Sequence, residues 1–277
     1  MQIIDGRKIA RGILAELKVR VAVLPFVPVF CDVLVGNNKP SAQYVNMKAK
    51  TAELIGIKFR RAEYAADILA QDLIGEIKSI SLEPNMCGLI VQLPLPAGLP
   101  RQEILDAIDP KVDVDCMGSK NLADFYNGKI HFVPPTAAAI MAILDTLDVD
   151  LSAKQFLVVG QGELVGKPVT FLLKRQGLKV GIADIDTKNT NELLKAADVI
   201  ISATGKAGLI TGDKIKPGAV IIDAGTSESK GGIVGDINFE SIKNVASAIS
   251  PVPGGVGPVT VAQLLGNVVL AVQNIIV

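Results

Sequence analysis

A tyrosine and a lysine four residues apart form the first pair in this sequence whose spacing could support chemistry. Tyr44 and Lys48 lie in a segment of helical periodicity expected to span about residues 41–55, so both side chains belong to one helix face. An amine in an apolar pocket loses its proton more readily than one in water, which would make Lys48 a proton carrier near neutral pH. The alternative is an ordinary solvated lysine beside Lys50, because most lysines lie on protein surfaces.

Three further polar side chains stand where burial is expected. Gln92 ends an apolar strand just before Pro94, and Asp113 and Asp115 alternate along an extended stretch. A buried amide or carboxylate needs hydrogen-bond partners, which come either from a polar ligand or from a capped turn. His131 is the only histidine and is expected to be structural or exposed, so no nucleophile activated by histidine can be assembled.

A glycine-rich turn in the second half of the chain has a spacing close to that of a dinucleotide site. Residues 160–166 read GQGELVG, follow the apolar strand 155–159 and open a helix. Glycines permit a tight turn and close approach of the backbone, while a helix N-terminus offers free N–H groups to a pyrophosphate. The GxGxxxG spacing is one residue longer than the usual fingerprint, so these glycines could instead serve only to shape the turn.

Polar residues at the ends of later strands extend this candidate site. Asp184 ends the next strand, where a carboxylate that binds a ribose 2′-hydroxyl is expected, although aspartate also caps turns. Ligands collect at the carboxyl ends of strands in open sheets. The expected cofactor contacts are Gly160, Gln161, Gly162, Val165, Asp184, Thr204, Gly205 and Thr226.

Short apolar runs alternate with helical periodicity along the chain, which predicts an α/β protein with mostly parallel strands. In the first half, the expected strands are 27–35, 57–61 and 88–92, and the expected helices are 41–55 and 68–80. In the second half, the expected strands are 155–159, 178–183, 198–202 and 219–223. The charge-free segment 260–277 is expected to be a buried helix rather than a membrane span, because it is short and carries several amides.

Composition excludes several classes of protein. The 277 residues include 28 Lys plus Arg and 28 Asp plus Glu, so neither a nucleic-acid backbone nor a charged membrane surface is an expected partner. The cysteines Cys31, Cys87 and Cys116 are far apart, and with a single histidine they form no zinc pattern, so no metal is expected. The lack of a disulfide pattern and of an apolar signal segment favours the cytoplasm.

Four segments together resemble the bifunctional methylenetetrahydrofolate dehydrogenase/cyclohydrolase family over essentially the whole chain. The first joins Val35-Gly36 to PSAQYVNMK at 40–48, and the second is GLIVQLPLP at 88–96. The third is DVD at 113–115, and the last is ISPVPGGVGPVT at 249–260. The second and last segments are long and specific, which makes a chance match remote.

The resemblance implies roles for residues that match the family motifs. Lys48 would transfer protons, and Gln92 would hydrogen-bond to it and keep it in a useful protonation state. Tyr44 would stack on the folate, and Asp115 would bind the polar edge of the pterin. The loop 251–258 would line the cleft for folate and nicotinamide with Pro253, Gly254, Gly255, Gly257 and Pro258. The resemblance also implies a homodimer.

The family fold implies two α/β domains, the second a Rossmann-like, doubly wound parallel sheet, and a C-terminal helix that packs back on the first. We place the folate-binding catalytic domain at residues 1–120 and 259–277 and the dinucleotide-binding domain at 121–258. The implied chemistry is hydride transfer from 5,10-methylenetetrahydrofolate to NAD(P)+, followed by hydrolysis of the methenyl form to 10-formyltetrahydrofolate. These reactions belong to one-carbon metabolism and purine biosynthesis, and they need no metal.

Two departures from the family pattern bear on the choice of cofactor. The usual Arg-Ser after the first glycine is Gln161-Gly162 here, and the usual His-Ser after the second strand is Asp184-Ile185. Both changes remove donors that would recognise a 2′-phosphate, so NAD+ is predicted over NADP+. Lys188 is nevertheless close enough in sequence to reach a phosphate.

Two other departures leave the number of activities open. The family's Pro-Cys-Thr-Pro reads PPTA at residues 134–137, and the glycine after Asp115 is Cys116. A member with only one activity, or a non-catalytic folate or dinucleotide sensor, therefore stands beside the bifunctional enzyme as an alternative. Lys48 and Gln92 argue against the sensor, because binding alone would not require them.

Overall fold

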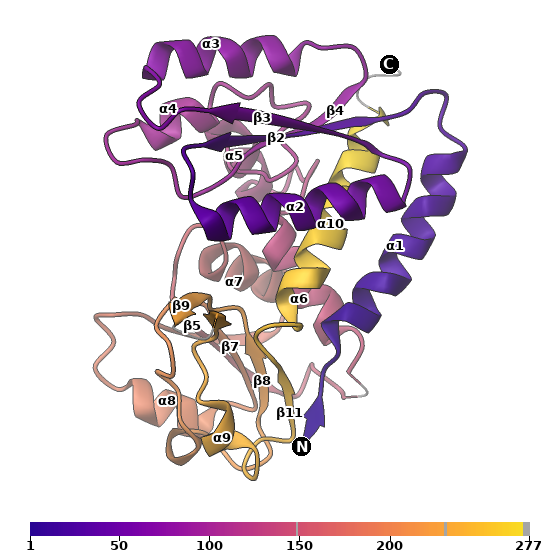
Figure 1. Cartoon of the computed structure of the whole chain (residues 1–277). Helices are drawn as coiled ribbons and strands as arrows, with labels where there is room; N and C mark the ends of the chain where they lie inside the picture. The colour runs from indigo at the N-terminus through magenta and orange to yellow at the C-terminus, as the bar shows by residue number, and fades with distance from the viewer. Residues whose placement is uncertain (148, 230–231, 274–277) are drawn as a thin grey trace. The chain divides into compact units, whose positions relative to one another are not determined.

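The protein consists of two compact units, each built on a parallel sheet (Figure 1). The computed structural model describes residues 1–147, 149–229 and 232–273. Unit 1 contains residues 1–11 and 136–260, and unit 2 contains residues 12–135 and those from 261 onward. Both units are of the α/β class that the alternation of apolar runs and helical segments predicts.

Unit 2 is a three-stranded parallel sheet in the order β3-β2-β4. Its strands are β2 (Val29–Val35), β3 (Lys58–Tyr64) and β4 (Met86–Val91). The two long helices that follow β2 and β3, α2 (Lys39–Leu54) and α3 (Ala70–Ser81), lie on opposite faces of the sheet in Figure 1. One face is closed by an apolar core that includes Val33, Leu73, Ile77 and Leu89. The central strand β2 is therefore shielded from water, and any polar side chain on it must find a partner inside the protein.

Two shorter helices complete unit 2, namely α4 (Arg101–Leu105) and α5 (Ser119–Tyr126). Two long helices contribute residues to both units, namely α1 (Gly6–Ala22) and α10 (Val256–Ala271). On α10, Asn267 Nδ2 donates hydrogen bonds to Val114 O at 2.8 Å and Val133 O at 2.9 Å. A Cβ on Gly88 of β4 would lie 2.7 Å from Val268 Cγ2, so glycine lets α10 approach the strand. The prediction that the C-terminal helix packs back on the first α/β domain is confirmed.

Unit 1 contains a six-stranded parallel sheet in the order β1-β11-β8-β7-β5-β6. Its strands are β1 (Gln2–Ile3), β5 (Gln155–Val159), β6 (Lys179–Ala183), β7 (Val199–Ser202), β8 (Val220–Asp223) and β11 (Ala248–Ser250). Its helices are α6 (Pro135–Leu144), α7 (Gly166–Arg175), α8 (Thr190–Ala196) and α9 (Phe239–Ile242). The chain runs from β5 to β6 on one side and then returns to β7 on the other, so the direction of winding reverses at β5. In such sheets this reversal opens a ligand crevice at the carboxyl ends of the strands.

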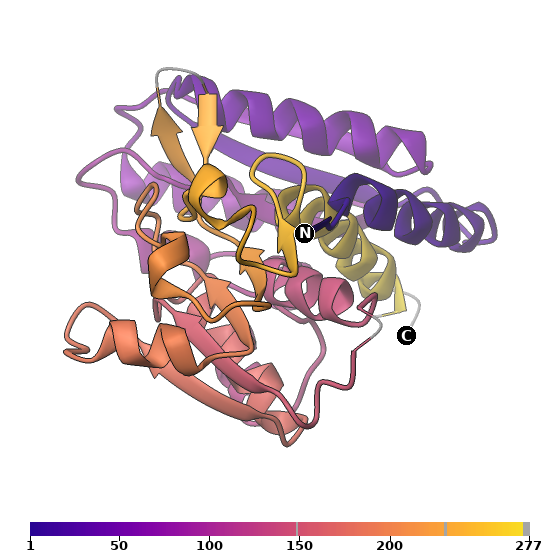
Figure 2. The ribbon, with the colours of Figure 1, turned by 90° about the horizontal axis from the view of Figure 1, so that it is seen from below.

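Two short elements of unit 1 lie outside the main sheet. Strands β9 (Ser227–Ser229) and β10 (Gly232–Val234) pair antiparallel with each other and lie side by side in Figure 2. A single turn of 3-10 helix, Gly212–Lys214, follows β7. Apolar side chains from the strands and from α8 and α9 close one face of the sheet, among them Leu157, Leu194, Ile200 and Ile242.

The structure divides the chain differently from the expected domains at residues 1–11, 121–135 and 259–260. Residues 2 and 3 form β1, whose Gln2 N–H donates to Ser247 O at 2.7 Å, so the extreme N-terminus joins the sheet of unit 1. Residues 121–135 belong to unit 2, where Asn121 Nδ2 donates to Pro110 O at 2.9 Å. A two-residue strand carries too little periodicity to be recognised in sequence, since pairing with a distant strand creates it.

No helix within the described ranges combines the length and the hydrophobicity that crossing a bilayer would require.

Candidate active site

Lys48 is buried on α2 and is held by three groups of unit 2. Only 2 % of the residue is exposed, so the alternative of a solvated lysine is wrong. Its Nζ donates a hydrogen bond to Gln92 Oε1 at 2.8 Å and lies 2.6 Å from Asp32 Oδ2. It also lies 5.0 Å from the centre of the Tyr44 ring, as the four-residue spacing on one helix face predicts. The sequence predicts sites at Tyr44 and Gln92, whereas Asp32 has no signal in the sequence.

Local structure brings these groups together at the carboxyl end of the sheet. α2 begins after a short turn at residues 36–38 that follows β2. Asn38 caps the helix by accepting a hydrogen bond from Ser41 N at 2.9 Å, and Pro40 occupies its first turn. Gln92 directly follows β4, and its backbone N–H donates to Val33 O of β2 at 2.8 Å. Its side-chain Nε2 donates to Leu93 O at 2.6 Å, which leaves Oε1 to accept from the lysine.

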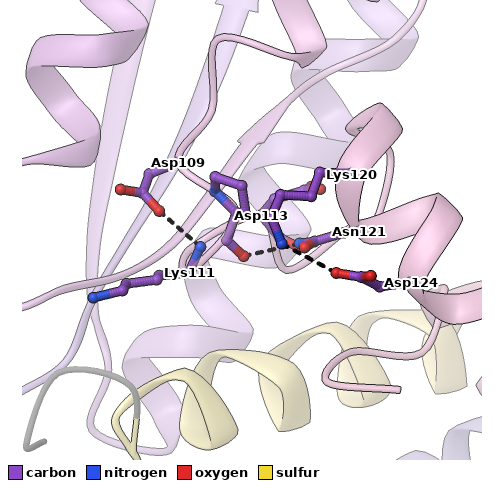
Figure 3. Close-up of polar contacts among 7 residues, drawn as sticks. Asp109, Lys111, Asp113, Lys120, Asn121 and Asp124 are labelled. Carbon is purple, nitrogen blue, oxygen red and sulfur yellow. Dashed lines mark hydrogen bonds and ion pairs between the residues drawn. The ribbon is translucent and has the colours of Figure 1, made fainter. Parts of the chain in front are cut away.

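Asp113 and Asp115 have different environments. Asp113 is buried and caps a turn, because Oδ1 accepts from Met117 N at 3.2 Å and Oδ2 accepts from Gly118 N at 3.0 Å. Figure 3 shows this segment, in which Asn121 also donates to the Asp113 carbonyl oxygen. For Asp113, the hydrogen-bond partners therefore come from a capped turn and not from a ligand.

Asp115 is partly buried, and no turn-capping hydrogen bond to its carboxylate is found among the described residues. Burial raises the pKa of Asp115 to about 6, while the Lys48 charge acts to lower it and the Asp113 and Asp32 carboxylates add to the rise. Because the Lys48 charge acts on the Asp115 carboxylate, the two side chains are near each other. All four predicted catalytic residues therefore lie in one region of unit 2.

The glycine turn of unit 1 is constrained at both ends and open in the middle. Gly160 has a φ of +92°, and a Cβ there would collide with Ala203 O. A Cβ on Gly166 would collide with Gly160 O at the start of α7. In the described part of the chain, no heavy atom beyond Gly162 and its two chain neighbours lies within 4 Å of the position that a Cβ on Gly162 would take. Gly160 and Gly166 therefore shape the turn, whereas Gly162 leaves its backbone accessible, as close approach of a ligand requires.

Two side chains are expected to determine the cofactor preference, Gln161 within this turn and Asp184 at the end of β6. Gln161 folds back toward α7, where its Nε2 donates to Thr170 Oγ1 at 3.3 Å. Asp184 is exposed at the end of β6, and its Oδ1 accepts from Thr187 Oγ1 at 2.8 Å and from Asp186 N at 3.1 Å. The turn-capping alternative for Asp184 is thus present in the structure, and it keeps a carboxylate at the strand end beside the glycine turn.

Three of the remaining expected cofactor residues, Thr204, Gly205 and Thr226, belong to two neighbouring loops of unit 1. Gly205 follows β7 with a φ of +65°, and the position of a Cβ there would be 3.9 Å from Thr226 O. Gly205 O also accepts from Ser227 Oγ at 2.8 Å. Thr204 precedes this glycine, so the loops after β7 and β8 meet at the carboxyl edge of the sheet, as predicted. Val165 is the residue just before α7.

Two buried aspartates, Asp223 and Asp236, order these loops. Asp236 is fully buried and accepts hydrogen bonds from Ser202 Oγ and Thr204 N, both at 2.7 Å, and from Lys206 N at 2.9 Å. Asp223, at the end of β8, accepts from the backbone N–H groups of residues 225, 236 and 237. Burial raises the pKa of Asp223 to about 6, and these hydrogen bonds act to lower it.

A sequence signal for these aspartates exists, because each has a glycine close by: Gly225 follows Asp223, and Gly235 precedes Asp236. A Cβ on Gly225 would collide with the Asp236 carboxylate, and one on Gly235 would collide with the Asp223 carboxylate. Each glycine thus makes room for the other segment's carboxylate.

The expected cleft loop at residues 251–258 differs from its predicted form at one end. Gly255 N donates to Pro251 O at 2.7 Å, and Gly254 adopts a φ of +107°, so the first part is a tight turn that contains Pro253. α10 begins at Val256, which places Gly257 and Pro258 in its first turn instead of in the loop. Proline fits there because the first turn of a helix leaves its N–H groups unused.

Comparison with known proteins decides the family. Residues 4–115 match the model for the tetrahydrofolate dehydrogenase/cyclohydrolase catalytic domain, and residues 134–276 match that for its NAD(P)-binding domain. The chain belongs to the tetrahydrofolate dehydrogenase/cyclohydrolase family. This confirms the resemblance found in the sequence motifs, and it assigns an NAD(P)-binding domain to the second half of the chain.

Relatives and solved structures match over nearly the full length of this family member. The bifunctional protein FolD of Staphylococcus carnosus is 39% identical over 274 residues, which cover 98% of this chain and 96% of that protein. The structure of the bifunctional enzyme FolD from Campylobacter jejuni superposes with a TM-score of 0.94 at 34% identity, with 99% of each chain covered. That of FolD from Trypanosoma brucei, complexed with NADP and an inhibitor, gives 0.93 at 33% identity and covers 99% of this chain and 98% of that one.

The departures from the family pattern are accommodated by local backbone structure. Cys116 stands where the family usually has glycine, and it adopts a φ of +57°, a conformation that glycine takes without strain. Its side chain is fully buried, so packing offsets part of that strain. Pro135 takes the first position of α6, and Ala137 is buried within that helix. Both departures thus preserve the turn and the helix in which they occur.

Proposed function

We propose that this protein oxidises 5,10-methylenetetrahydrofolate to the methenyl form with NAD(P)+ as hydride acceptor, and hydrolyses the methenyl form to 10-formyltetrahydrofolate. Family membership over both domains supports the pair of activities. The observation that carries the proposal is the buried Lys48, because a pure binding protein has no need of an amine held by Gln92 beside a stacking tyrosine.

In unit 2, each side chain has a distinct task. The Tyr44 ring offers a face on which the flat pterin stacks, and the Asp115 carboxylate accepts hydrogen bonds from the polar edge of the pterin. In the hydrolytic step, water oxygen bonds to the methenyl carbon and its proton passes to the Lys48 amine. When the carbon–nitrogen bond of the ring breaks, the electron pair stays on nitrogen, which takes a proton from Lys48, and the second proton of water leaves to solvent.

In unit 1, the residues fit a dinucleotide at the carboxyl edge of the sheet. The open position at Gly162 and the N-terminus of α7 would receive the pyrophosphate, while Thr204, Gly205 and Thr226 line the neighbouring loops. When bound, the nicotinamide supplies the hydride acceptor. The task of these residues is to orient it, since orientation of two bound reactants provides a large part of the rate enhancement.

We propose further that NAD+ is preferred over NADP+. The Asp184 carboxylate at the end of β6 would accept from a ribose 2′-hydroxyl and repel a 2′-phosphate, and Gln161 is directed toward α7. Arg175 is the only arginine after residue 120 and lies in the last turn of α7, away from the glycine turn at its start. We expect kcat/KM to favour NAD+ by about tenfold or more, which corresponds to about 1.4 kcal/mol.

Dehydrogenase kinetics with both cofactors test this preference. Asp184→Ser should shift the ratio toward NADP+, because it removes the repelling charge and retains a hydroxyl. Asp186→Ser is the matched control, since Asp186 is equally exposed two residues away and should leave the ratio unchanged. A wild-type enzyme that favours NADP+ would contradict the proposal.

We expect folate binding to weaken as the pH falls through about 6. Burial raises the pKa of Asp115 to about 6, so below that pH its carboxyl group is protonated and loses acceptor capacity toward the pterin. The KM for 5,10-methylenetetrahydrofolate, measured from about pH 5 to about pH 8, should rise at the acid end. Asp115→Asn should have a high KM with little pH dependence. A wild-type KM that is constant over this range would refute the role of Asp115.

Absorbance of the methenyl folate, followed with each cofactor and then after the cofactor is removed, tests the two activities separately. Formation without decay would indicate a dehydrogenase alone, and decay without formation would indicate a cyclohydrolase alone. The lack of both would indicate a non-catalytic protein.

We also propose that the protein is a homodimer in the cytoplasm. The homodimer rests on the family resemblance, and the cytoplasm fits the three free, buried cysteines. Light scattering on the purified chain measures the oligomeric state.

A further inference from the structure

A buried carboxylate on the central strand of unit 2 lies against the lysine of the proposed active site. Asp32 is the fourth of the seven residues of β2 and has an exposed fraction of 0 %. Its Oδ2 lies 2.6 Å from Lys48 Nζ. Among the described residues, neither carboxylate oxygen has a hydrogen-bond donor in good geometry, and the contact with Lys48 is an ion pair. The lysine is therefore the partner that makes this buried charge tolerable.

Folding alone does not explain an aspartate at this position. The other residues of β2 are apolar, and an apolar side chain in place of Asp32 would avoid the burial of a carboxylate that lacks backbone donors. The structural aspartates of this protein look different, because Asp113 and Asp223 accept hydrogen bonds from backbone N–H groups. Asp32 interacts instead with the functional amine.

The charges around Asp32 come from several elements of unit 2. Burial raises the pKa of Asp32, and the positive charges of Lys48 on α2 and Arg61 on β3 act to lower it without reversing the rise. The Asp32 charge in turn raises the pKa values of three neighbours, Tyr44, Asp115 and Cys31, and in each of them burial is the larger cause. Arg61 is also paired with Glu63 and donates to Asn46, so Lys48 is the cation in direct contact with Asp32.

The Asp32–Lys48 pair has two forms of the same total charge. In one, the carboxylate faces an ammonium group; in the other, a carboxylic acid faces a neutral amine, and the two differ only by the position of one proton along a 2.6 Å contact. An ammonium group cannot accept a proton from water, whereas the neutral amine can. A neighbour that takes the lysine proton therefore generates the form that the hydrolytic step requires.

We propose that Asp32 is a positioning residue for Lys48: the Asp32 carboxylate fixes Lys48 Nζ and exchanges one proton with it during methenyl hydrolysis. The inference rests on the proposed function of Lys48. The lysine proton passes to Asp32 Oδ2, and the freed amine takes a proton from the attacking water as oxygen bonds to the methenyl carbon. Nitrogen of the opening ring receives the electron pair and a proton from Lys48. Asp32 then returns its proton to the amine, and the second proton of water leaves to solvent.

Asp32→Asn tests this role, because asparagine keeps the shape and an oxygen for Lys48 but is uncharged and cannot take up the lysine proton. We expect kcat of the cyclohydrolase to fall about tenfold or more, with the KM for the methenyl folate changed less than about twofold. The hydride-transfer rate should change less, since that step moves no proton through Lys48. A purely structural role would affect both activities together.

The pH profile of cyclohydrolase kcat provides a second readout. A buried ammonium group that has lost its carboxylate partner gives up its proton more readily, so the limb of the profile that belongs to this pair should move about one unit toward lower pH. This direction holds whether the amine or the ammonium form is the active one. Asp32→Glu keeps the charge and the proton and should restore the position of that limb.

Cys31→Ala is the matched control. Cys31 precedes Asp32 on β2, is equally buried, and its pKa is raised by burial to about 12, so it is uncharged over the whole profile. Its loss perturbs the same strand without removing a charge, and we expect the profile of this variant to follow that of the wild type. An Asp32→Asn variant with wild-type rate and profile would overturn the inference, whereas a wild-type protein without cyclohydrolase activity would contradict the proposed function instead.

Thermal unfolding provides a test that does not depend on activity, including for a variant that folds poorly. Lys48→Met leaves Asp32 buried without its cation, so the double variant Asp32→Asn/Lys48→Met should have a higher Tm than Lys48→Met alone at neutral pH. Effects of the two substitutions on Tm that simply add would show that the side chains are not coupled and would overturn the inference.

Discussion

Replacing Lys48 with methionine is expected to abolish cyclohydrolase turnover, with a loss of about 10²–10⁴-fold, the usual contribution of a positioned proton-transfer group. Methionine fills a similar volume but cannot accept the proton of the attacking water. Lys48 is buried and fixed by Gln92 and Asp32, so solvent or a neighbouring lysine cannot replace it easily. Decay of the methenyl absorbance measures the loss, and circular dichroism shows whether the variant is folded.

Lys50→Met is the control for this prediction, because Lys50 lies on the same helix but is exposed. It should retain the wild-type rate. Hydride transfer in Lys48→Met should persist at a reduced level, since that step depends on how folate and nicotinamide are oriented more than on the amine. Full cyclohydrolase turnover in Lys48→Met would refute the assignment of Lys48 and, with it, the mechanism proposed for unit 2.

Replacing Asp236 with asparagine is expected to destabilise unit 1 by about 3–5 kcal/mol, because each hydrogen bond to a charged group is worth about 1.5–3 kcal/mol. The carboxylate is fully buried and accepts from Ser202, Thr204 and Lys206. An asparagine has one acceptor oxygen, and its NH2 group would face backbone N–H donors. The loop after β7 should therefore lose its order, and the KM for NAD+ should rise together with the drop in stability.

Urea unfolding measures the free energy change, and dehydrogenase kinetics measure the KM. Asp213→Asn is the matched control, since Asp213 is exposed and accepts a hydrogen bond from Thr211 Oγ1. It should leave both quantities close to those of the wild type. An Asp236→Asn variant with unchanged stability and KM would show that the β7 loop is held by other contacts.

Most of the secondary structure could be predicted from the sequence, because the longer elements have strong periodicity of their own. The strand at 155–159 was predicted at its observed bounds, and α2 and α3 within about two residues. The short strands β1 and β11 were missed. Each forms by pairing with a neighbour far away in the chain, so neither carries a local signal.

The candidate site was predicted in part for a similar reason. Tyr44 and Lys48 are related by helix geometry, and Gln92 and Asp115 belong to motifs that the family shares. Asp32 carries no such signal, because a single aspartate in an apolar strand acquires meaning only when the fold brings an amine against it. Asp236 has only an indirect signal, the adjacent Gly235, because its three donors lie 30 to 34 residues earlier in the chain.

The sequence by itself determined the family, the alternation of strands and helices, and the types of side chain that could carry the chemistry. These features depend on local periodicity and on motifs that are contiguous in the chain. Only the tertiary structure decided that Lys48 is buried, that Asp32 is its partner, and that Asp113 caps a turn while Asp115 lies near the lysine. Burial and charge pairing depend on residues that are remote in sequence, and for this reason the protonation chemistry of the site follows from the fold.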